Sequence, residues 1–111
     1  MYGSIARLHL KPGKDEELRQ LGQEMAPQIP GFVSQHVYRM DADPNELYLV
    51  VAFENERAYR ANAESPEQHQ RYEQFRALLD ADPVWHDGEI IDTYPRQRDW
   101  VTEARSRSMT R

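Results

Sequence analysis

The sequence predicts a single α+β domain in which the elements follow the order β-α-β-β-α-β and the strands form an antiparallel sheet. Three observations predict this fold class. First, 111 residues is the length of one domain. Second, four short segments rich in apolar residues are bounded by turn-forming residues, as strands are. Third, two other segments combine helix-start residues with apolar residues three or four positions apart.

The first half of the chain contains a strand, a helix and a second strand. Residues 2–10 alternate apolar and mixed side chains, and Lys11-Pro12-Gly13 closes this strand with a turn. The next apolar residues recur with helical spacing up to the break at Pro30-Gly31, and they are Leu18, Leu21, Met25 and Ile29. Residues 32–40 form the second strand. Strict alternation would put Phe32, Ser34, His36, Tyr38 and Met40 on one face of it.

The second half begins with a hairpin and ends with a strand. Residues 41–45 have the composition of a tight turn, and residues 47–53 are almost all apolar, so we expect a strand buried on both faces. The last strand is expected over residues 84–94, with a break near Asp87-Gly88.

Two capped helices are predicted between these strands. Asn55 is the expected N-cap of a helix that carries Asn62. Ser65 is the expected cap of the next helix, with Pro66 in its first position and Gln68 able to reach back to the cap. On that helix His69, Tyr72 and Phe75 or Arg76 are expected to share a face.

This order of elements is the ferredoxin-like split βαβ arrangement. Helices on one face of the sheet leave the other face in need of cover. We expect strands 2–10 and 47–53 to be apolar on both faces, and therefore a homodimer whose two sheets pack together. Residues 1–94 would form the domain. Residues 95–111 have low hydrophobicity and high charge, and are expected to be an extended or disordered tail with Trp100 as its large apolar residue.

Composition excludes several classes of function. The net charge of −5 argues against a nucleic-acid-binding protein. The charge is unevenly distributed: the tail has five arginines and two acidic residues, a net +3, so residues 1–94 carry −8. The absence of cysteine rules out disulfides, a thiol nucleophile and a thiolate metal site. No segment resembles a signal peptide or a membrane span. We expect a soluble, cytoplasmic protein.

No motif for metal, nucleotide or triad chemistry is present. His9, His36, His69 and His86 lack the local spacing of metal ligands, so no metal site is predicted. No serine lies in a nucleophile-elbow context, and the five glycines form no phosphate loop.

Polar residues on the two predicted helices are the candidates for chemistry. Asn62 is expected to point inward, where an amide needs hydrogen-bond partners; alternatively it bonds to backbone or to solvent at the helix end. Tyr72 faces the same way, either as an active-site hydroxyl or as a core aromatic with its hydroxyl at the rim. His69 is a candidate base, or a rim histidine. Trp85 and His86 lie on opposite faces of their strand, so only one of them can line a pocket.

Four landmarks give the chain a resemblance to a known family. They are Lys11-Pro12-Gly13-Lys14, Pro30-Gly31-Phe32, Phe53-Glu54-Asn55-Glu56-Arg57-Ala58-Tyr59 and Ser65-Pro66-Glu67-Gln68-His69. In order and spacing they resemble the antibiotic biosynthesis monooxygenase family over about residues 3–94. The resemblance implies a dimeric α+β barrel with a pocket between sheet and helices in each subunit.

Some members of this family are cofactor-independent oxygenases of anthrones or quinols. In polyketide anthrone oxygenases a counterpart of Tyr59-Arg60-Ala61-Asn62 supplies an active-site asparagine, and a tyrosine at the position of Tyr72 is also implicated. The tryptophan used with them has no counterpart here, where Pro66 and its neighbours stand. The haem-degrading branch is a poor match, because its asparagine, tryptophan and histidine correspond to Ala6, Asn62 and Tyr72.

The resemblance therefore predicts a monooxygenase that acts on a small aromatic molecule and O₂ without a cofactor. Asn62, Tyr72 and His69 are the candidate catalytic residues, and the candidates for contact with the substrate are Tyr59, Phe75, Trp85 and His36. The main alternative is a small-molecule-binding or stress-related domain of the same fold without catalytic activity. An isomerase or decarboxylase is a third alternative.

Overall fold

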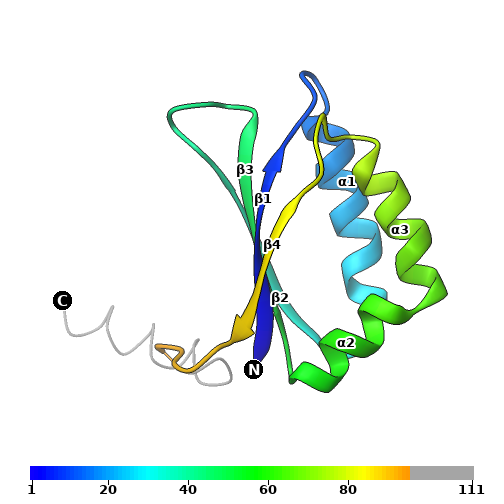
Figure 1. The fold of residues 1–111 in the computed structure, drawn as a ribbon, viewed down its shortest axis with the longest axis vertical. Coiled ribbons are helices and arrows are strands. Elements are labelled where there is room, and N and C mark those ends of the chain that lie inside the picture. Colours follow the sequence, from blue (N-terminus) through cyan, green and yellow to red (C-terminus); the bar gives the residue numbers. More distant parts are fainter. Residues whose placement is uncertain (96–111) are drawn as a thin grey trace, which may run out of the picture.

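The structure is a computed structural model and describes residues 1–95 (Figure 1). Its elements are β1 (Tyr2–His9), α1 (Asp15–Met25), the 3₁₀ turn η1 (Ala26–Gln28), β2 (Phe32–Arg39), β3 (Glu46–Phe53), α2 (Glu56–Glu64), α3 (Pro66–Arg76) and β4 (Val84–Glu89). The strands pair in the order β2-β3-β1-β4, and every neighbouring pair is antiparallel. All three α-helices cover one face of the sheet. The α+β, ferredoxin-like prediction is confirmed, whereas the predicted tail lies almost wholly outside the described residues.

Local capping interactions set the start of α2 and α3. The Asn55 side chain accepts a hydrogen bond from the backbone N–H of Ala58 at 2.8 Å, and Ser65 Oγ accepts one from the N–H of Gln68 at 3.1 Å. Both predicted caps are therefore confirmed. The expected return bond from the Gln68 side chain to Ser65 is not found; this side chain accepts hydrogen bonds from Asn62 and Arg71 instead.

Three details of the strands differ from the predictions. Phe32 pairs with Phe53 and Ser34 with Ala52, so Val33 is an extra residue that forms a bulge. This bulge moves Phe32 to the helix-covered face, away from His36 and Tyr38. The last strand ends at Glu89 and continues through Asp87 and Gly88 without a break.

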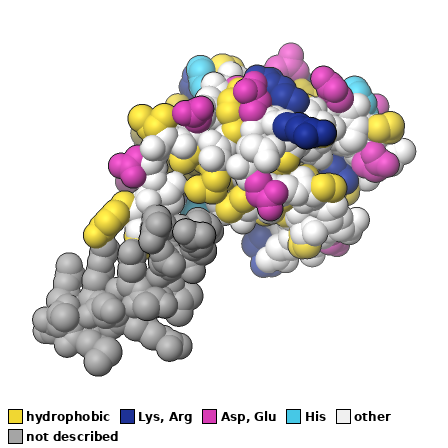
Figure 2. Space-filling model, turned by 90° about the horizontal axis from the view of Figure 1, so that it is seen from below, with side chains coloured by type: hydrophobic (Ala, Val, Ile, Leu, Met, Phe, Trp, Pro, Cys, Tyr) yellow, Lys and Arg dark blue, Asp and Glu magenta, His cyan; other side chains and the backbone are white. Residues whose placement is uncertain are grey.

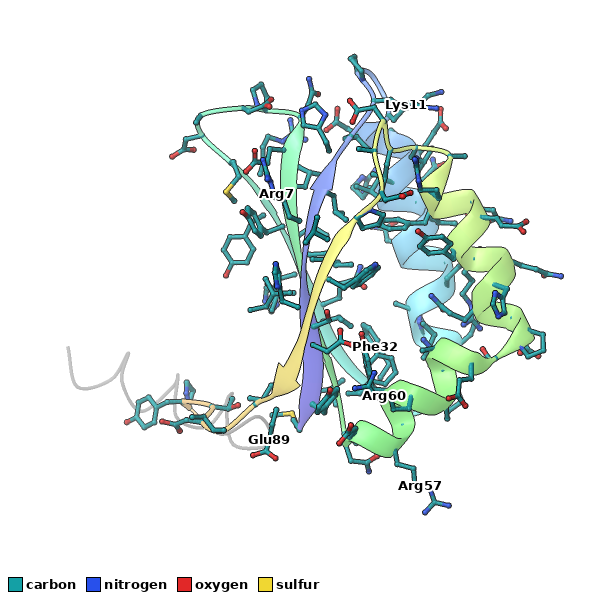
Figure 3. All side chains as sticks on the ribbon, viewed as in Figure 1. Arg7, Lys11, Phe32, Arg57, Arg60 and Glu89 are labelled. Atoms are coloured by element: carbon teal, nitrogen blue, oxygen red, sulfur yellow. The ribbon has the colours of Figure 1, made fainter. Side chains whose placement is uncertain are left out.

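The outer face of β1 is less apolar than predicted. It presents Ile5 and Arg7, both exposed, to the side of the sheet that carries no helix. Figure 3 shows Arg7 on the opposite side of the sheet from Phe32 and Arg60. The prediction that β1 is apolar on both faces is therefore wrong, because Arg7 interrupts the outer row.

The hydrophobic core occupies one end of the sheet, where β1 ends and β3 begins. Leu8, Leu10 and Leu79 are fully buried there, together with Ala6, Leu47 and Leu78. Leu10 forms a bridge with Leu79, which ties the segment after α3 to the end of β1. Next to this core, His9 bonds to Asp80 at 2.6 Å and to Asp43 at 3.1 Å, and these hydrogen bonds raise the pKa of His9.

The opposite end of the sheet is closed by aromatic side chains under α2. Tyr59 packs against Tyr2 and Phe53, with ring centroids 5.3 and 5.5 Å apart, and Phe53 packs against Phe32 at 5.9 Å. The helical layer is therefore fastened to the sheet at both ends.

Acidic, basic and hydrophobic side chains are interspersed on the face seen from this end (Figure 2). Within residues 1–95, no helix has the length and apolar character needed to cross a bilayer. The cytoplasmic location stays a prediction.

Two glycines with positive φ provide a matched test of the turn that leads into β2. Gly13 and Gly31 have φ of +82° and +77°, but a Cβ on Gly13 meets no atom within 4 Å, whereas one on Gly31 lies 2.6 Å from Ala58 Cβ. We expect Gly13→Ala to cost about 1–2 kcal/mol from the backbone conformation alone. Gly31→Ala should lower the free energy of unfolding further, because α2 must also shift. Urea denaturation of both variants measures the difference, and equal losses would contradict the close packing of α2 on this turn.

Candidate functional site

A large cavity lies between the sheet and helices α1 and α3. Its volume is about 640 Å³, within the range of small-molecule sites. Its apolar lining from the strands comprises Leu8, Phe32, Val37, Leu47, Leu49 and Trp85. Its apolar lining from α1 and the turn after it comprises Leu18, Leu21, Met25, Ala26 and Ile29, and α3 adds Tyr72 and Phe75.

The cavity extends to both edge strands of the sheet, β2 and β4. On these edge strands, Val37 remains 49% exposed and Trp85 40% exposed, although both belong to the helix-covered face. Tyr72 and Phe75 form an aromatic wall on α3, with ring centroids 6.4 Å apart. The shape and lining suit a flat, mostly apolar molecule.

Two ion pairs lie at the cavity beside α1. Arg39 pairs with Asp15, which joins β2 to the start of α1, and Arg19 pairs with Glu16 within α1. The Arg19 guanidinium lowers the pKa of Glu16 by hydrogen bonding. These four charges largely neutralise one another.

A cluster of three polar side chains spans the bend between α2 and α3. Asn62 Nδ2 donates to Gln68 Oε1 at 3.3 Å. Arg71 Nη1 donates to Asn62 Oδ1 at 3.1 Å and to Gln68 Oε1 at 3.2 Å. Gln68 and Arg71 line the cavity, and Asn62 contacts them from α2. We call these three residues the bend cluster.

The predicted site residues fall into two groups. Tyr72, Phe75 and Trp85 line the cavity, and Asn62 belongs to the bend cluster beside it. His69, Tyr59 and His36 are not among the residues that line it. His69 is exposed on α3, and His36 pairs with Val50 on the outer face of the sheet. The catalytic and binding roles of all seven residues stay predictions.

Sequence reasoning missed Gln68 and Arg71 as cavity residues. They precede Tyr72 and Phe75 by four positions each, so the helical repeat would have placed all four on one face. Gln68 was interpreted only as part of a helix cap, and Arg71 was not considered.

Tyr59 takes part in a partly buried hydrogen-bond network at the closed end of the sheet. Its hydroxyl donates to Asp87 Oδ1 at 2.7 Å, and the buried Ser4 hydroxyl donates to the same oxygen at 2.8 Å. Burial, together with the bond to Asp87, raises the pKa of Tyr59 to about 12. Burial acts to raise the pKa of Asp87, but the bonds from Tyr59 and Ser4 and the charge of Arg60 outweigh it and lower that pKa.

Metal-binding geometry is not found in the described part of the chain. Across residues 1–95, no group of three or more His, Asp or Glu side chains converges in a way that could hold a metal ion. Helix α3 contributes the phenol of Tyr72, the Arg71 guanidinium and the Gln68 amide to the cavity, and the Asn62 amide bonds to two of these groups from α2.

Comparisons with solved structures identify the same fold in other proteins. SnoaB, a cofactor-independent oxygenase from Streptomyces nogalater solved with one asparagine replaced by alanine, has a TM-score of 0.71 at 17% identity, covering 86% of this chain and 97% of SnoaB. Rv0793 from Mycobacterium tuberculosis has a TM-score of 0.66 at 22% identity, covering 84% and 97%. A conserved protein from Methanosarcina mazei has a TM-score of 0.67 at 18% identity, covering 79% of this chain and 90% of its own.

The sequence matches a family model but no individual protein with a curated description. The sequence model of antibiotic biosynthesis monooxygenases matches residues 1–80, which is most of the chain and includes the sheet up to β3 and all three helices. The chain therefore belongs to the antibiotic biosynthesis monooxygenase family.

Proposed function

We propose that this protein is a cofactor-independent monooxygenase that acts on a small aromatic substrate of the anthrone or quinol type. The observation that carries the proposal is the 640 Å³ apolar cavity, whose wall includes Tyr72, Phe75 and Trp85. Membership of the monooxygenase family and the likeness in fold to SnoaB support it. The proposal extends beyond family membership in naming the substrate class and the absence of a cofactor.

The proposed reaction needs a base and a group that stabilises an anion. The substrate carbon loses a proton, and the resulting anion transfers an electron to O₂. The two radicals combine to a peroxide anion, which takes back the proton from the base. The hydroperoxide then loses water to leave a carbonyl group, so one oxygen atom enters the product and the other enters water. Tyr72 is the proposed proton-transfer group, because it lines the cavity and His69 does not.

Asn62 is the proposed holder of the substrate oxygen. Its Nδ2 group forms a long bond of 3.3 Å to Gln68, which a ligand oxygen can replace. Arg71 holds the carbonyl end of the same amide, so the orientation of Asn62 is already set. An amide oriented before the substrate binds stabilises a developing oxyanion without reorganisation.

Oxygen consumption with 1,8-dihydroxyanthrone tests the proposed reaction. Purified protein treated with EDTA, and given no flavin or iron, should consume one O₂ per substrate and release the anthraquinone. Heat-denatured protein measures the background oxidation of the anthrone. Turnover that requires added iron or flavin would exclude the cofactor-free mechanism.

Substitutions at the bend cluster and the aromatic wall separate an enzyme from a binding protein. Asn62→Ala and Tyr72→Phe should each lower kcat about 10²-fold or more, with nearly unchanged melting temperatures. Gln70→Ala is the control, because it removes an amide from the exposed surface of α3 outside the cavity lining. If both cavity variants instead lose about 1–3 kcal/mol of stability and turn over normally, these polar groups are structural. The binding-domain alternative would then be favoured.

We further propose that the protein is a homodimer formed through the outer face of the sheet. That face exposes Ile5 (48%), Tyr38 (55%) and Val84 (49%), around the partly buried Tyr48 and Val50. A permanent interface on it would bury roughly 2,000 Å² or more in total.

Light scattering at micromolar concentration tests this assembly. The unaltered protein should have the mass of a dimer, and Ile5→Glu, which places a charge near the centre of the sheet face, should have the mass of a monomer. Gln20→Glu on the exposed surface of α1 adds the same charge and should leave the dimer intact. A monomer mass for the unaltered protein would refute the proposed interface.

A further inference from the structure

The charges around the cavity leave one arginine without an acidic partner. The cavity is lined by two acidic residues, Asp15 and Glu16, and by three arginines. Arg39 and Arg19 are paired with the two acids. Within residues 1–95, no carboxylate lies at ion-pair distance from Arg71. The lining therefore carries a formal charge of +1 in a protein whose net charge is −5.

The hydrogen bonds of Arg71 fix its orientation while leaving one edge open. Nη1 makes both of its bonds, to Asn62 Oδ1 and to Gln68 Oε1. Among the described residues, Nε and Nη2 have no hydrogen-bond partner. These two groups form the edge of a guanidinium that binds both oxygens of a carboxylate.

Arg71 lies within one helical turn of the aromatic wall formed by Tyr72 and Phe75. Arg71 and Phe75 are four residues apart on α3, which is one turn and roughly 6 Å along the helix. Both residues, and Tyr72 between them, line the same cavity. A planar ring system against Tyr72 and Phe75 can therefore carry a carboxylate that reaches Arg71.

We propose that the cavity binds an aromatic substrate bearing a carboxylate, and that Arg71 is the residue that recognises it. The carboxylate binds through Nε and Nη2 of Arg71, and the ring system lies in the apolar part of the cavity. Asn62 and Gln68 hold the guanidinium in place, so its side chain does not have to be ordered when the ligand arrives. The inference rests on the proposed function only for the aromatic character of the ligand.

Isothermal titration calorimetry with two matched probes tests the inference without turnover. The probes are anthraquinone-2-carboxylate and anthraquinone-2-carboxamide, which have the same ring system and nearly the same size but differ in charge. The unaltered protein should bind the carboxylate about tenfold or more tightly than the carboxamide. Arg71→Gln should abolish this preference, so that the variant binds the two probes with nearly equal affinity.

Two further variants keep the test specific. Arg71→Lys retains the charge but cannot form a bidentate hydrogen bond with a carboxylate, so it should keep only part of the preference for the carboxylate probe. Arg57→Gln removes an arginine that points away from the molecule on α2, and should keep all of it (Figure 3). Thermal melts of each variant establish that the fold is intact at the temperature of the titration.

The outcomes distinguish this inference from the proposed function. Equal binding of the two probes by the unaltered protein, binding of neither probe, or a preference that persists in Arg71→Gln overturns the role of Arg71. A preference that depends on Arg71 in a protein that does not oxidise the anthrone supports the inference and refutes the oxygenase. Turnover of the anthrone without any preference for the carboxylate supports the oxygenase and refutes the role of Arg71.

Discussion

The carboxylate of Asp87 joins three elements of this fold, and the position of α2 over the sheet depends on it. Asp87 lies on β4 and accepts hydrogen bonds from Ser4 on β1 and from Tyr59 on α2. Arg60 on α2 reaches its second oxygen at 3.4 Å and also donates to the Tyr2 hydroxyl at 2.8 Å. Removing this carboxylate would leave the buried Ser4 hydroxyl and the Tyr59 hydroxyl without their acceptor, which is costly inside a protein.

The cavity follows from the separation between this network and the leucine core. The network fastens α2 at one end of the sheet, and Leu8, Leu10 and Leu79 fasten the segments after β1 and α3 at the other. Leu18, Leu21 and Phe75 pack against the leucine core, and a cavity remains between α1, α3 and the sheet. A small domain that gives up part of its core in this way loses apolar burial. A bound apolar ligand, or a second copy on the outer face of the sheet, would restore some of it.

The bend between α2 and α3 brings polar groups to this apolar space. Asn62 is on one helix and Gln68 and Arg71 are on the next, and Ser65 caps the second helix between them. The three side chains bond to one another, which lowers part of the cost of partial burial for an amide and a guanidinium. One edge of Arg71 and the weak bond of Asn62 remain available to a ligand. The polar part of the site is thus held rigid by its own hydrogen bonds rather than by a ligand.

The sequence by itself determined the features that depend on neighbours along the chain. Asn55 and Ser65 start helices because their side chains bond to N–H groups three residues later, and the order β-α-β-β-α-β follows from apolar spacing and turns. Tyr72 was expected to point inward because the helical repeat sets the direction of a side chain. Family membership was also readable, since its landmarks are short runs of consecutive residues.

Only the tertiary structure decided the features that depend on partners distant in sequence. The bulge at Val33 arises from the pairing of β2 with β3, and it moved Phe32 into the cavity. Tyr59 bonds to Asp87, 28 residues away, and so lies in the network at the closed end. The open edge of Arg71 depends on which acids reach which arginines across elements. Strand register and charge pairing are set by contacts between segments, and a repeat of two or 3.6 residues carries no information about them.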